Sequence, residues 1–360
     1  MGNPVLEINV SLIRKSAAAV RAVCAAAGIN PTAVVKGYNA LDEVTEALAD
    51  AGYQSFASSR LPHLKRVKDR LSAETMALRI PMQSEVVDVV ELADISLNSE
   101  LATVRLLDLE AARQKKRHKV ILMRDLGDLR EGFIDEERFV ETACAVERGC
   151  GNIILHGVGT NLSCYGSVIP TPENLSILLR GAWEIERRIG RRLDVISGGA
   201  STSLYLVVNG EMPNGVNHLR IGAANLLLSE ASNVPEGAIP ELTDETFILK
   251  AEIIEIGEKP THPIGKLGTD AFGNVRTYED KGVRRRALLA VGAFDAGDHK
   301  KLVPLDKGVV LLGCSSDHMI ADIEDSEQNY RLGDTVAMTT RYQAMLFATE
   351  NDLVEKRFVE

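Results

Sequence analysis

The run Lys119–Asp125 (KVILMRD) carries four consecutive apolar residues before it turns polar. A strand with one solvent-exposed face alternates apolar and polar residues, so a continuous apolar run predicts a strand buried on both faces. Similar short runs recur along the chain, and together they are Thr32–Lys36, Ser55–Ser58, Met76–Ile80, Asp94–Leu97, Lys119–Asp125, Asn152–Val158, Leu193–Ser197 and His218–Ile221. We expect all eight to be parallel strands of one sheet.

Longer amphipathic segments separate these runs and predict helices between the strands. In one long segment Pro172 stands at the first turn, where a missing N–H costs nothing, and Gly190 marks the end. The predicted helices are Ser11–Gly28, Leu41–Gly52, Arg60–Arg70, Ser84–Leu92, Asn98–Lys116, Asp135–Gly149 and Thr171–Gly190. Eight strand units within roughly 230 residues favour a closed (β/α)8 TIM barrel over an open sheet.

The pattern changes after residue 232. Residues 233–244 are rich in Pro, Gly and acidic residues, which is typical of a linker. Strand-like runs without long helices follow, namely Phe247–Ile256, Arg286–Val291, Val309–Leu312, Met319–Ile323 and Thr335–Thr340. The sequence therefore predicts a barrel in residues 1–232 and a C-terminal, mostly antiparallel β domain in residues 233–360. Residues 1–9 are left free in this prediction to pack with the second domain.

Composition and charge exclude several classes of protein. The chain carries 41 Lys and Arg against 51 Asp and Glu, and a net charge of −10 disfavours binding to nucleic acid. The five cysteines form no CxxC pair and the seven histidines show no HxH or HExxH spacing, so we expect neither a disulfide framework nor a metal site. No apolar run reaches the ~18 residues of a membrane helix and no signal peptide opens the chain, which favours a soluble cytoplasmic protein.

Polar residues at the carboxyl ends of the runs form the candidate site, because barrel enzymes build their active sites there. Ser197–Ser201 (SGGAS) and Arg220–Gly222 (RIG) follow the last two strands. Their glycines let backbone N–H groups approach an anion, so these turns predict a phosphate site. Lys36 directly follows a buried strand, where burial among cations lowers a lysine pKa and favours a Schiff base. A lysine of this kind joined to a phosphate site suggests pyridoxal 5'-phosphate (PLP).

The same residues resemble those of the fold-type III PLP enzymes, the alanine racemase-like family. Ala33–Lys36 resembles the strand that carries the cofactor lysine, Ser197–Ser203 the turn near the phosphate, and Leu219–Gly222 the Arg-x-Gly turn. The motifs VVK (34–36), RIPM (79–82), ADISLNSE (93–100), DLGDLREG (125–132), NLSCYG (161–166), SGGAS (197–201), DAFGN (270–274), YEDKG (278–282) and SSDH (315–318) read like those of the members that racemise basic amino acids such as ornithine. The resemblance covers nearly the whole chain.

This resemblance implies a homodimeric, PLP-dependent racemase that interconverts L- and D-amino acids, with active sites at the interface. Lys36 would hold the cofactor and act as one acid/base, Arg220 would face the pyridine nitrogen, and Arg130 would bind the phenolate oxygen. An arginine keeps its proton, so the ring nitrogen stays unprotonated and the carbanion is short-lived, which suits racemisation. The implied neighbours of the phosphate are Ser197, Gly199, Ser201, Ile221, Gly222 and Tyr342.

The chain departs from the family at the second acid/base, which must stand on the face opposite Lys36. Alanine racemases use a tyrosine from the partner's second domain, and the corresponding stretch Ala290–Asp295 (AVGAFD) has none, which argues against alanine as the main substrate. The candidate replacements are Tyr278, Asp317 and His318 in the second domain and Cys164 and Tyr165 on the barrel. We favour His318, because the reference pKa of histidine, about 6.5, suits proton transfer in both directions.

The residues named so far are compatible with more than one substrate and more than one reaction. The distal ammonium of ornithine needs a carboxylate or ordered water, and Glu279, Asp280, Asp295 and Asp317 are available in the second domain. A fold-type III decarboxylase of basic amino acids shares the barrel and the lysine, and Gly313–Asp317 (GCSSD) resembles its cysteine-bearing loop, but it would place a carboxylate where Arg220 stands. A non-catalytic PLP-binding protein resembles the barrel alone, so the second domain counts against it.

Overall fold

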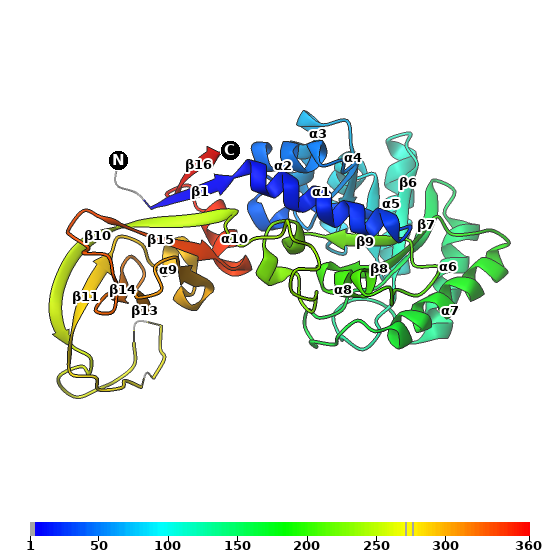
Figure 1. The fold of residues 1–360 in the computed structure, drawn as a ribbon. Helices are drawn as coiled ribbons and strands as arrows, with labels where there is room; N and C mark the ends of the chain where they lie inside the picture. The colour runs from blue at the N-terminus through cyan, green and yellow to red at the C-terminus, as the bar shows by residue number, and fades with distance from the viewer. Residues whose placement is uncertain (1–3, 271, 276) are drawn as a thin grey trace. The chain divides into compact units, whose positions relative to one another are not determined.

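The computed structural model describes residues 4–270, 272–275 and 277–360 (Figure 1). The chain divides into two compact units. One, which we call the barrel unit, is Ser11–Thr243, and the other, which we call the β unit, joins Met1–Val10 to Asp244–Glu360. All but the last residue of the stretch 233–244 therefore belongs to the barrel unit.

Eight parallel strands close into a barrel in chain order. They are β2 (Asn30–Val34), β3 (Ser55–Ser58), β4 (Glu74–Ala77), β5 (Ile95–Asn98), β6 (His118–Met123), β7 (Ile153–Gly159), β8 (Val195–Ala200) and β9 (His218–Ile221). Each overlaps one of the eight predicted runs, and β9 pairs with β2 to close the ring. The predicted TIM-barrel fold is confirmed.

Helices surround the barrel strands (Figure 1). They are α1 (Val10–Ala26), α2 (Asp42–Asp50), α3 (Leu61–Arg70), α4 (Val86–Leu92), α5 (Leu101–Arg113), α6 (Glu136–Gly149), α7 (Pro172–Ile189) and α8 (Leu204–Val208). Helix α7 begins with a capping box, in which Thr171 and Asn174 bond each other's backbone N–H, and it ends at Gly190 in the left-handed conformation (φ +76°). Local sequence signals thus set both ends of this helix.

Apolar side chains fill the barrel unit in two layers. Phe139 of α6, Ile185 of α7 and Val158 of β7 share one buried cluster between helices and strands. Met76 and Ile121 belong to another, formed by residues of neighbouring strands. Burying each such side chain contributes about 1.5–3 kcal/mol. These layers support the strand ends that carry the candidate site.

The β unit is built on a sheet that is mostly antiparallel, as predicted. Its strands β10 (Phe247–Pro260), β11 (Val283–Leu289), β12 (Leu302–Pro304), β13 (Val310–Cys314), β14 (Met319–Asp322) and β15 (Thr335–Thr340) run in the order β12-β15-β10-β11-β14-β13. Strand β1 (Val5–Asn9) pairs antiparallel with β10 and parallel with β16 (Glu355–Val359). Helices α9 (Ala293–Ala296) and α10 (Tyr342–Glu350) complete the unit. None of the helices in the described ranges combines the length and apolarity that crossing a bilayer requires.

Candidate active site

Three cationic side chains gather at the carboxyl ends of the barrel strands. Lys36 opens a short 3-10 turn, η1 (Lys36–Tyr38), just after β2, and Arg220 lies in the adjacent β9, in register with Thr32 of β2. Arg130 follows β6. Burial lowers the pKa of Lys36, and the charges of Arg130 and Arg220 lower it further. A lysine with a lowered pKa has a larger neutral fraction that can attack a carbonyl carbon.

Arg220 is a buried cation held by neutral oxygens. Only 3% of it is exposed, and its guanidinium donates to the hydroxyl of Ser197 and, at 2.6 Å, to the carbonyl oxygen of Thr160. Burial lowers the pKa of Arg220 to about 10, so the side chain stays charged at neutral pH. The hydroxyl oxygen of Thr160 is buried and lacks a hydrogen-bond partner among the described residues. Unsatisfied buried groups of this kind are rare unless water or a ligand completes them, so they mark this point as a place for a polar ligand.

A chain of hydrogen bonds supports Arg220 from inside the barrel. Ser197 Oγ, the acceptor for Arg220, lies 2.9 Å from Nδ1 of His218, whose Nε2 lies 2.9 Å from the hydroxyl of Thr32. Thr32 in turn donates to Ser55 at 3.0 Å. Each hydroxyl has one proton, so all donors point the same way and we assign the ring proton of His218 to Nε2. Burial lowers the pKa of His218 to about 3, which keeps this tautomer neutral.

The two glycine turns meet at Ser201. This residue opens the 3-10 turn η3 (Ser201–Ser203), and its hydroxyl oxygen accepts the N–H of Gly222 at 3.2 Å and of Ala224 at 3.3 Å. Gly199 has φ +118°, and a Cβ there would lie 2.6 Å from the hydroxyl of Ser203. The site thus joins a hydroxyl of one turn to backbone N–H groups of the other, and the hydroxyl proton of Ser201 can be donated to an anion. Ile221, which lies between Arg220 and Gly222 in the sequence, is fully buried in β9.

Asp128 holds the loop that follows β7. Its carboxylate accepts the backbone N–H of Tyr165 at 2.9 Å, of Val168 at 3.2 Å and of Cys164 at 3.3 Å. Burial alone would raise the pKa of Asp128, but these N–H groups hold it below its usual range. The clamp sets Cys164 beside Arg130, which points an N–H at Sγ from 2.6 Å. The loop is therefore ordered by one carboxylate.

Replacing Asp128 by Asn is expected to release this loop. An amide offers one acceptor oxygen, and its NH2 group repels N–H donors, so local stability falls by about 2–3 kcal/mol. Hydrogen exchange of the amides of residues 164–168 should then rise roughly 30- to 150-fold. The control Asp108→Asn, whose carboxylate accepts the N–H of Asn152 at 2.7 Å, should leave these amides protected.

The same clamp predicts a dependence on pH in the unmodified protein. A carboxyl group whose pKa is lowered by folding contributes stability above its unfolded value, 3.8, and loses it as the pH falls through the folded pKa. Protection of the loop should therefore persist at neutral pH and disappear only in acid. Equal exchange in Asp128→Asn and the unmodified protein at pH 7 would contradict the assignment.

Two of the predicted second acid/base residues lie on one hairpin of the β unit. Asp317 and His318 are exposed between β13 and β14. The hairpin packs against Ala290–Asp295, the stretch that lacks the family's tyrosine, since the carbonyl oxygens of residues 315 and 316 accept the N–H groups of residues 293 and 294 at 2.9 Å. Close approach requires glycine at 292, where a Cβ would lie 2.1 Å from the carbonyl oxygen of Ser316. His318 thus lies two residues from a backbone contact with this stretch.

The remaining predicted residues of the β unit fall in other segments. Tyr278 lies between β10 and β11, with its ring 6.1 Å from that of His262, and Tyr342 opens α10. Asp295 stands closer to the hairpin: burial raises its pKa, and the charge of Asp317 raises it further. Glu279 forms an ion pair with Lys281 at 3.1 Å, and Asp280 accepts the N–H of Gly282 at 2.9 Å and the hydroxyl of Thr261 at 3.4 Å, so both already have partners within the β unit.

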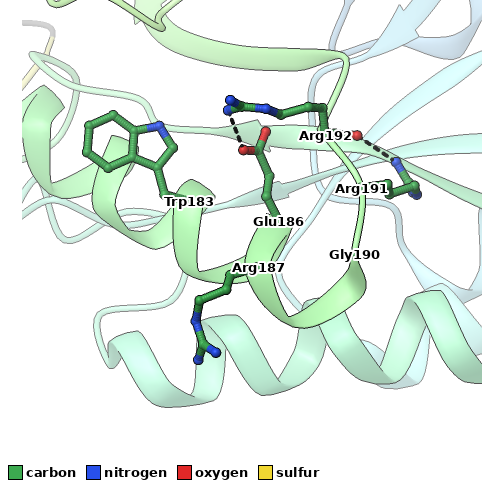
Figure 2. Close-up of a pocket in the computed structure, with 6 residues that line it drawn as sticks. All are labelled: Trp183, Glu186, Arg187, Gly190, Arg191 and Arg192. Atoms are coloured by element: carbon green, nitrogen blue, oxygen red, sulfur yellow. Dashed lines mark hydrogen bonds and ion pairs between the residues drawn. The ribbon is translucent and has the colours of Figure 1, made fainter.

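A pocket on the outside of the barrel unit lies away from these residues (Figure 2). It is lined by Trp183, Glu186, Arg187, Gly190, Arg191 and Arg192, where α7 turns toward β8. Connections from helix to strand lie at the amino ends of barrel strands, opposite the candidate site. Its charges are already matched, since Arg192 pairs with Glu186 at 2.8 Å and Arg187 with Glu184 at 2.7 Å. The pocket therefore has little to offer a charged ligand. Among the described residues, no group of three His, Cys, Asp or Glu could hold a metal ion.

Several residues of the site had no role in the sequence-based prediction. Asp128 and Glu131 stand inside the quoted segment DLGDLREG, and the density of polar residues after a buried strand was the available signal. Thr160 was visible only as a polar residue that follows the sixth predicted run, and His218 gave no signal, because it is an ordinary strand residue until the barrel closes. Ser197 was predicted to lie near the phosphate. In the structure it is fully buried, and its hydroxyl oxygen accepts an N–H of Arg220.

Comparison with known proteins identifies relatives over the full length of the chain. The family model described as "Alanine racemase, N-terminal domain" matches residues 8–229, more than half of the chain. An ornithine racemase of Acetoanaerobium sticklandii is 41% identical over 99% of both chains. A lysine racemase of Thermotoga maritima is 37% identical over 98% of both. The predicted amino-acid racemase is confirmed by these relatives.

Solved structures confirm the fold at lower identity. The alanine racemase of Streptomyces lavendulae superposes with a TM-score of 0.74 at 16% identity and covers 100% of this chain and 98% of its own. That of Bartonella henselae, solved with covalently bound pyridoxal phosphate, gives 0.72 at 13% identity, and each chain is covered completely. Family model, full-length relatives and fold agree: the chain belongs to the alanine racemase N-terminal domain family.

Proposed function

We propose that this protein is a PLP-dependent racemase of ornithine that works in the cytoplasm as a homodimer. The observation that carries the proposal is the set of groups at the carboxyl ends of the barrel strands, where the buried Lys36 interacts with the charges of Arg130 and Arg220 and where Ser201 joins the two glycine turns. The 41% identity to an ornithine racemase supports the choice of substrate. The 37% identity to a lysine racemase supports the wider class of basic amino acids.

The chemistry of this donor set fits PLP. Lys36 supplies an amine for the cofactor's carbonyl carbon, and Ser201, whose hydroxyl oxygen accepts the N–H of Gly222, can donate its hydroxyl proton to a phosphate. Arg220 is a buried cation that needs a further neutral acceptor, as a pyridine nitrogen would provide, and Arg130 offers N–H groups to a phenolate. When bound, PLP withdraws electrons from the amino acid and so acidifies the hydrogen on Cα.

The chain's own residues then direct that acidity toward racemisation. The Lys36 amine, with its lowered pKa, takes the proton from Cα on one face and returns it there. Arg220 keeps its proton because its pKa of about 10 stands well above neutrality. Facing the ring nitrogen of PLP, it would donate a hydrogen bond without giving up its proton, which would limit electron withdrawal and favour fast return of the proton to Cα over side reactions such as transamination.

We assign the second acid/base to His318, supplied by the partner copy in the dimer. Support comes from the hairpin of His318, which packs on Ala290–Asp295, the stretch where alanine racemases carry their tyrosine. An imidazole has a nitrogen that can accept a proton and a nitrogen that can donate one, as an acid/base on this face must. The cytoplasm suits Cys24, Cys144, Cys150 and Cys164, which are all present as thiols.

Replacing His318 by Gln is expected to lower kcat for racemisation of L-ornithine by about 10²- to 10⁴-fold, the usual effect of losing an acid/base group. The visible absorbance of bound PLP should stay unchanged, because Lys36 is intact. The matched variants Asp317→Asn and Tyr278→Phe test the other candidates and should retain most of the activity. Full activity in His318→Gln, with loss in Tyr278→Phe, would move the role to Tyr278.

The reaction itself is tested by product analysis. PLP-loaded protein is incubated separately with L-ornithine, L-lysine and L-alanine, and the products are separated by chiral chromatography. We expect equal amounts of both ornithine enantiomers, reached from either one, with slower conversion of lysine and least of alanine. Release of carbon dioxide would establish the decarboxylase instead, and binding of PLP without any product would establish a non-catalytic PLP-binding protein.

A further inference from the structure

Glu131 is a carboxylate in the middle of the three cations. Its two oxygens accept N–H groups from Nε and a terminal nitrogen of Arg130, the second at 2.6 Å. Its charge also acts on Lys36, whose pKa it raises, and on Arg220, whose pKa it raises as well. The Glu131 side chain is only 15% exposed, against 39% for Arg130. One largely buried carboxylate therefore interacts with three positively charged groups, by hydrogen bonds with Arg130 and by its charge with Lys36 and Arg220.

The Arg130 guanidinium is held from two sides. Of its five N–H groups, two go to Glu131 and one points to Cys164 Sγ at 2.6 Å, so that in the described contacts two remain for a ligand. A long arginine side chain loses rotamer freedom when it is fixed. Here Glu131 and Cys164 fix the Arg130 side chain before a ligand arrives, which lowers the entropy cost of binding.

The backbone of the loop is bent to place this pair. Leu129, directly before Arg130, adopts φ +58°, a left-handed conformation that is unfavourable for a residue other than glycine. The carboxylate of Asp125 stabilises the turn by accepting the N–H of Gly127 at 2.8 Å and of Leu129 at 3.2 Å. Such strain persists where the surrounding structure enforces it, and it clusters at ligand sites.

We propose that Glu131 is a positioning residue of this site: its carboxylate holds Arg130 in the orientation that presents the remaining N–H groups to the phenolate oxygen of PLP, and it balances the charge of Lys36 and Arg220. The proposal rests on the proposed function, because it needs PLP as the ligand. An ordinary exposed Arg–Glu pair contributes little to stability and leaves ligand binding unchanged. A positioning role makes a different prediction.

The test replaces Glu131 by Gln, which keeps the shape and removes the charge. The cofactor is stripped from the full-length protein, PLP is titrated back, and its visible absorbance is followed. We expect PLP to bind roughly tenfold more weakly, the equivalent of about one charge-assisted hydrogen bond. The midpoint of the pH titration of that absorbance should fall by on the order of one unit, because an anion beside the Lys36 nitrogen favours its protonated form. Glu131→Asp keeps the charge and should recover most of the midpoint.

The matched control is Glu147→Gln. Glu147 binds Arg191 in the same two-pronged manner, with both contacts at 2.7 Å, in the part of the barrel unit that includes the pocket of Figure 2. PLP affinity and titration midpoint should be unchanged in this control. If Glu131→Gln still racemises ornithine and its PLP affinity and titration midpoint are the same as those of the unmodified protein, the positioning role alone is overturned. An unmodified protein that does not bind PLP at all would overturn the proposed function and this inference together.

Discussion

Replacing Lys36 by Ala is expected to remove the visible absorbance band of lysine-bound PLP, leaving only that of the free aldehyde, and to reduce racemisation of L-ornithine by about 10⁴-fold or more. The variant removes the amine that holds the cofactor and the base that moves the Cα proton. The remaining donors, Ser201 and Arg220, still bind PLP, so the protein should retain non-covalent cofactor that dialysis removes. Rates are measured by chiral chromatography and cofactor binding by absorbance before and after dialysis.

A small primary amine should restore part of the lost activity. Alanine at position 36 leaves room where the lysine chain stood, and added methylamine can enter it and act as the base. The control Lys119→Ala removes an amine from the opposite end of the barrel, where it pairs with Glu74 at 2.6 Å, and should leave absorbance and activity intact. Normal absorbance in Lys36→Ala would exclude Lys36 as the attachment point.

Replacing Arg220 by Glu is expected to lower kcat/KM for racemisation by about 10²- to 10³-fold, the usual effect of removing one preorganised electrostatic group. A carboxyl group at this position would favour a protonated ring nitrogen, and stronger electron withdrawal would then permit transamination. We therefore expect slow conversion of bound PLP to its amine form during turnover, which is visible by absorbance. Rapid racemisation without such conversion would contradict the role of Arg220.

The conservative variant Arg220→Lys separates chemistry from folding. It keeps a charge near Ser197 and Thr160 but cannot make both contacts with one planar group. Loss of stability should be smaller than in Arg220→Glu, which leaves the buried Ser197–His218 pair without its donor, and thermal denaturation measures both. Arg191→Lys, far from the predicted cofactor residues in the fold, is the matched control for arginine replacement.

The barrel could be predicted because its strands carry a local signal. Runs such as residues 120–123 are apolar without interruption, and this pattern belongs to strands covered on both faces. Proline at 172 and glycine at 190 likewise act through the backbone of their own helix. Signals of this kind lie within a few residues of the element that they specify.

Other parts depend on partners that are distant in sequence. The stretch 233–244 has the composition of a linker, yet Ile239 and Leu242 are buried in one cluster with Val20 of α1. Strand β1 takes its place from pairing with β10 and β16, more than 200 residues away. Helix α10 lies outside the predicted runs, because YQAMLFATE offers neither a polar cap nor a clean amphipathic pattern.

The site shows the same division. The lysine, the arginines and the glycine turns could be predicted, since each ends or follows a recognisable run and resembles a family motif. The support network of Arg220 could not, because it arises from the register that sets Thr32 beside Arg220 when β9 closes on β2. Glu131 is adjacent to Arg130 in the sequence, but the contact between their side chains depends on the bend of the backbone at Leu129.

The central claim, racemisation of ornithine by proton transfer on two faces of Cα, is tested most directly by deuterium labelling. Unlabelled L-ornithine is incubated with the PLP-loaded protein in deuterated water, and both enantiomers are isolated at low conversion for mass spectrometry. We expect D-ornithine with one deuterium at Cα, because the group on the second face donates from solvent, while the remaining L-ornithine is still largely unlabelled. Failure to form D-ornithine, or a product released with carbon dioxide, would contradict the account.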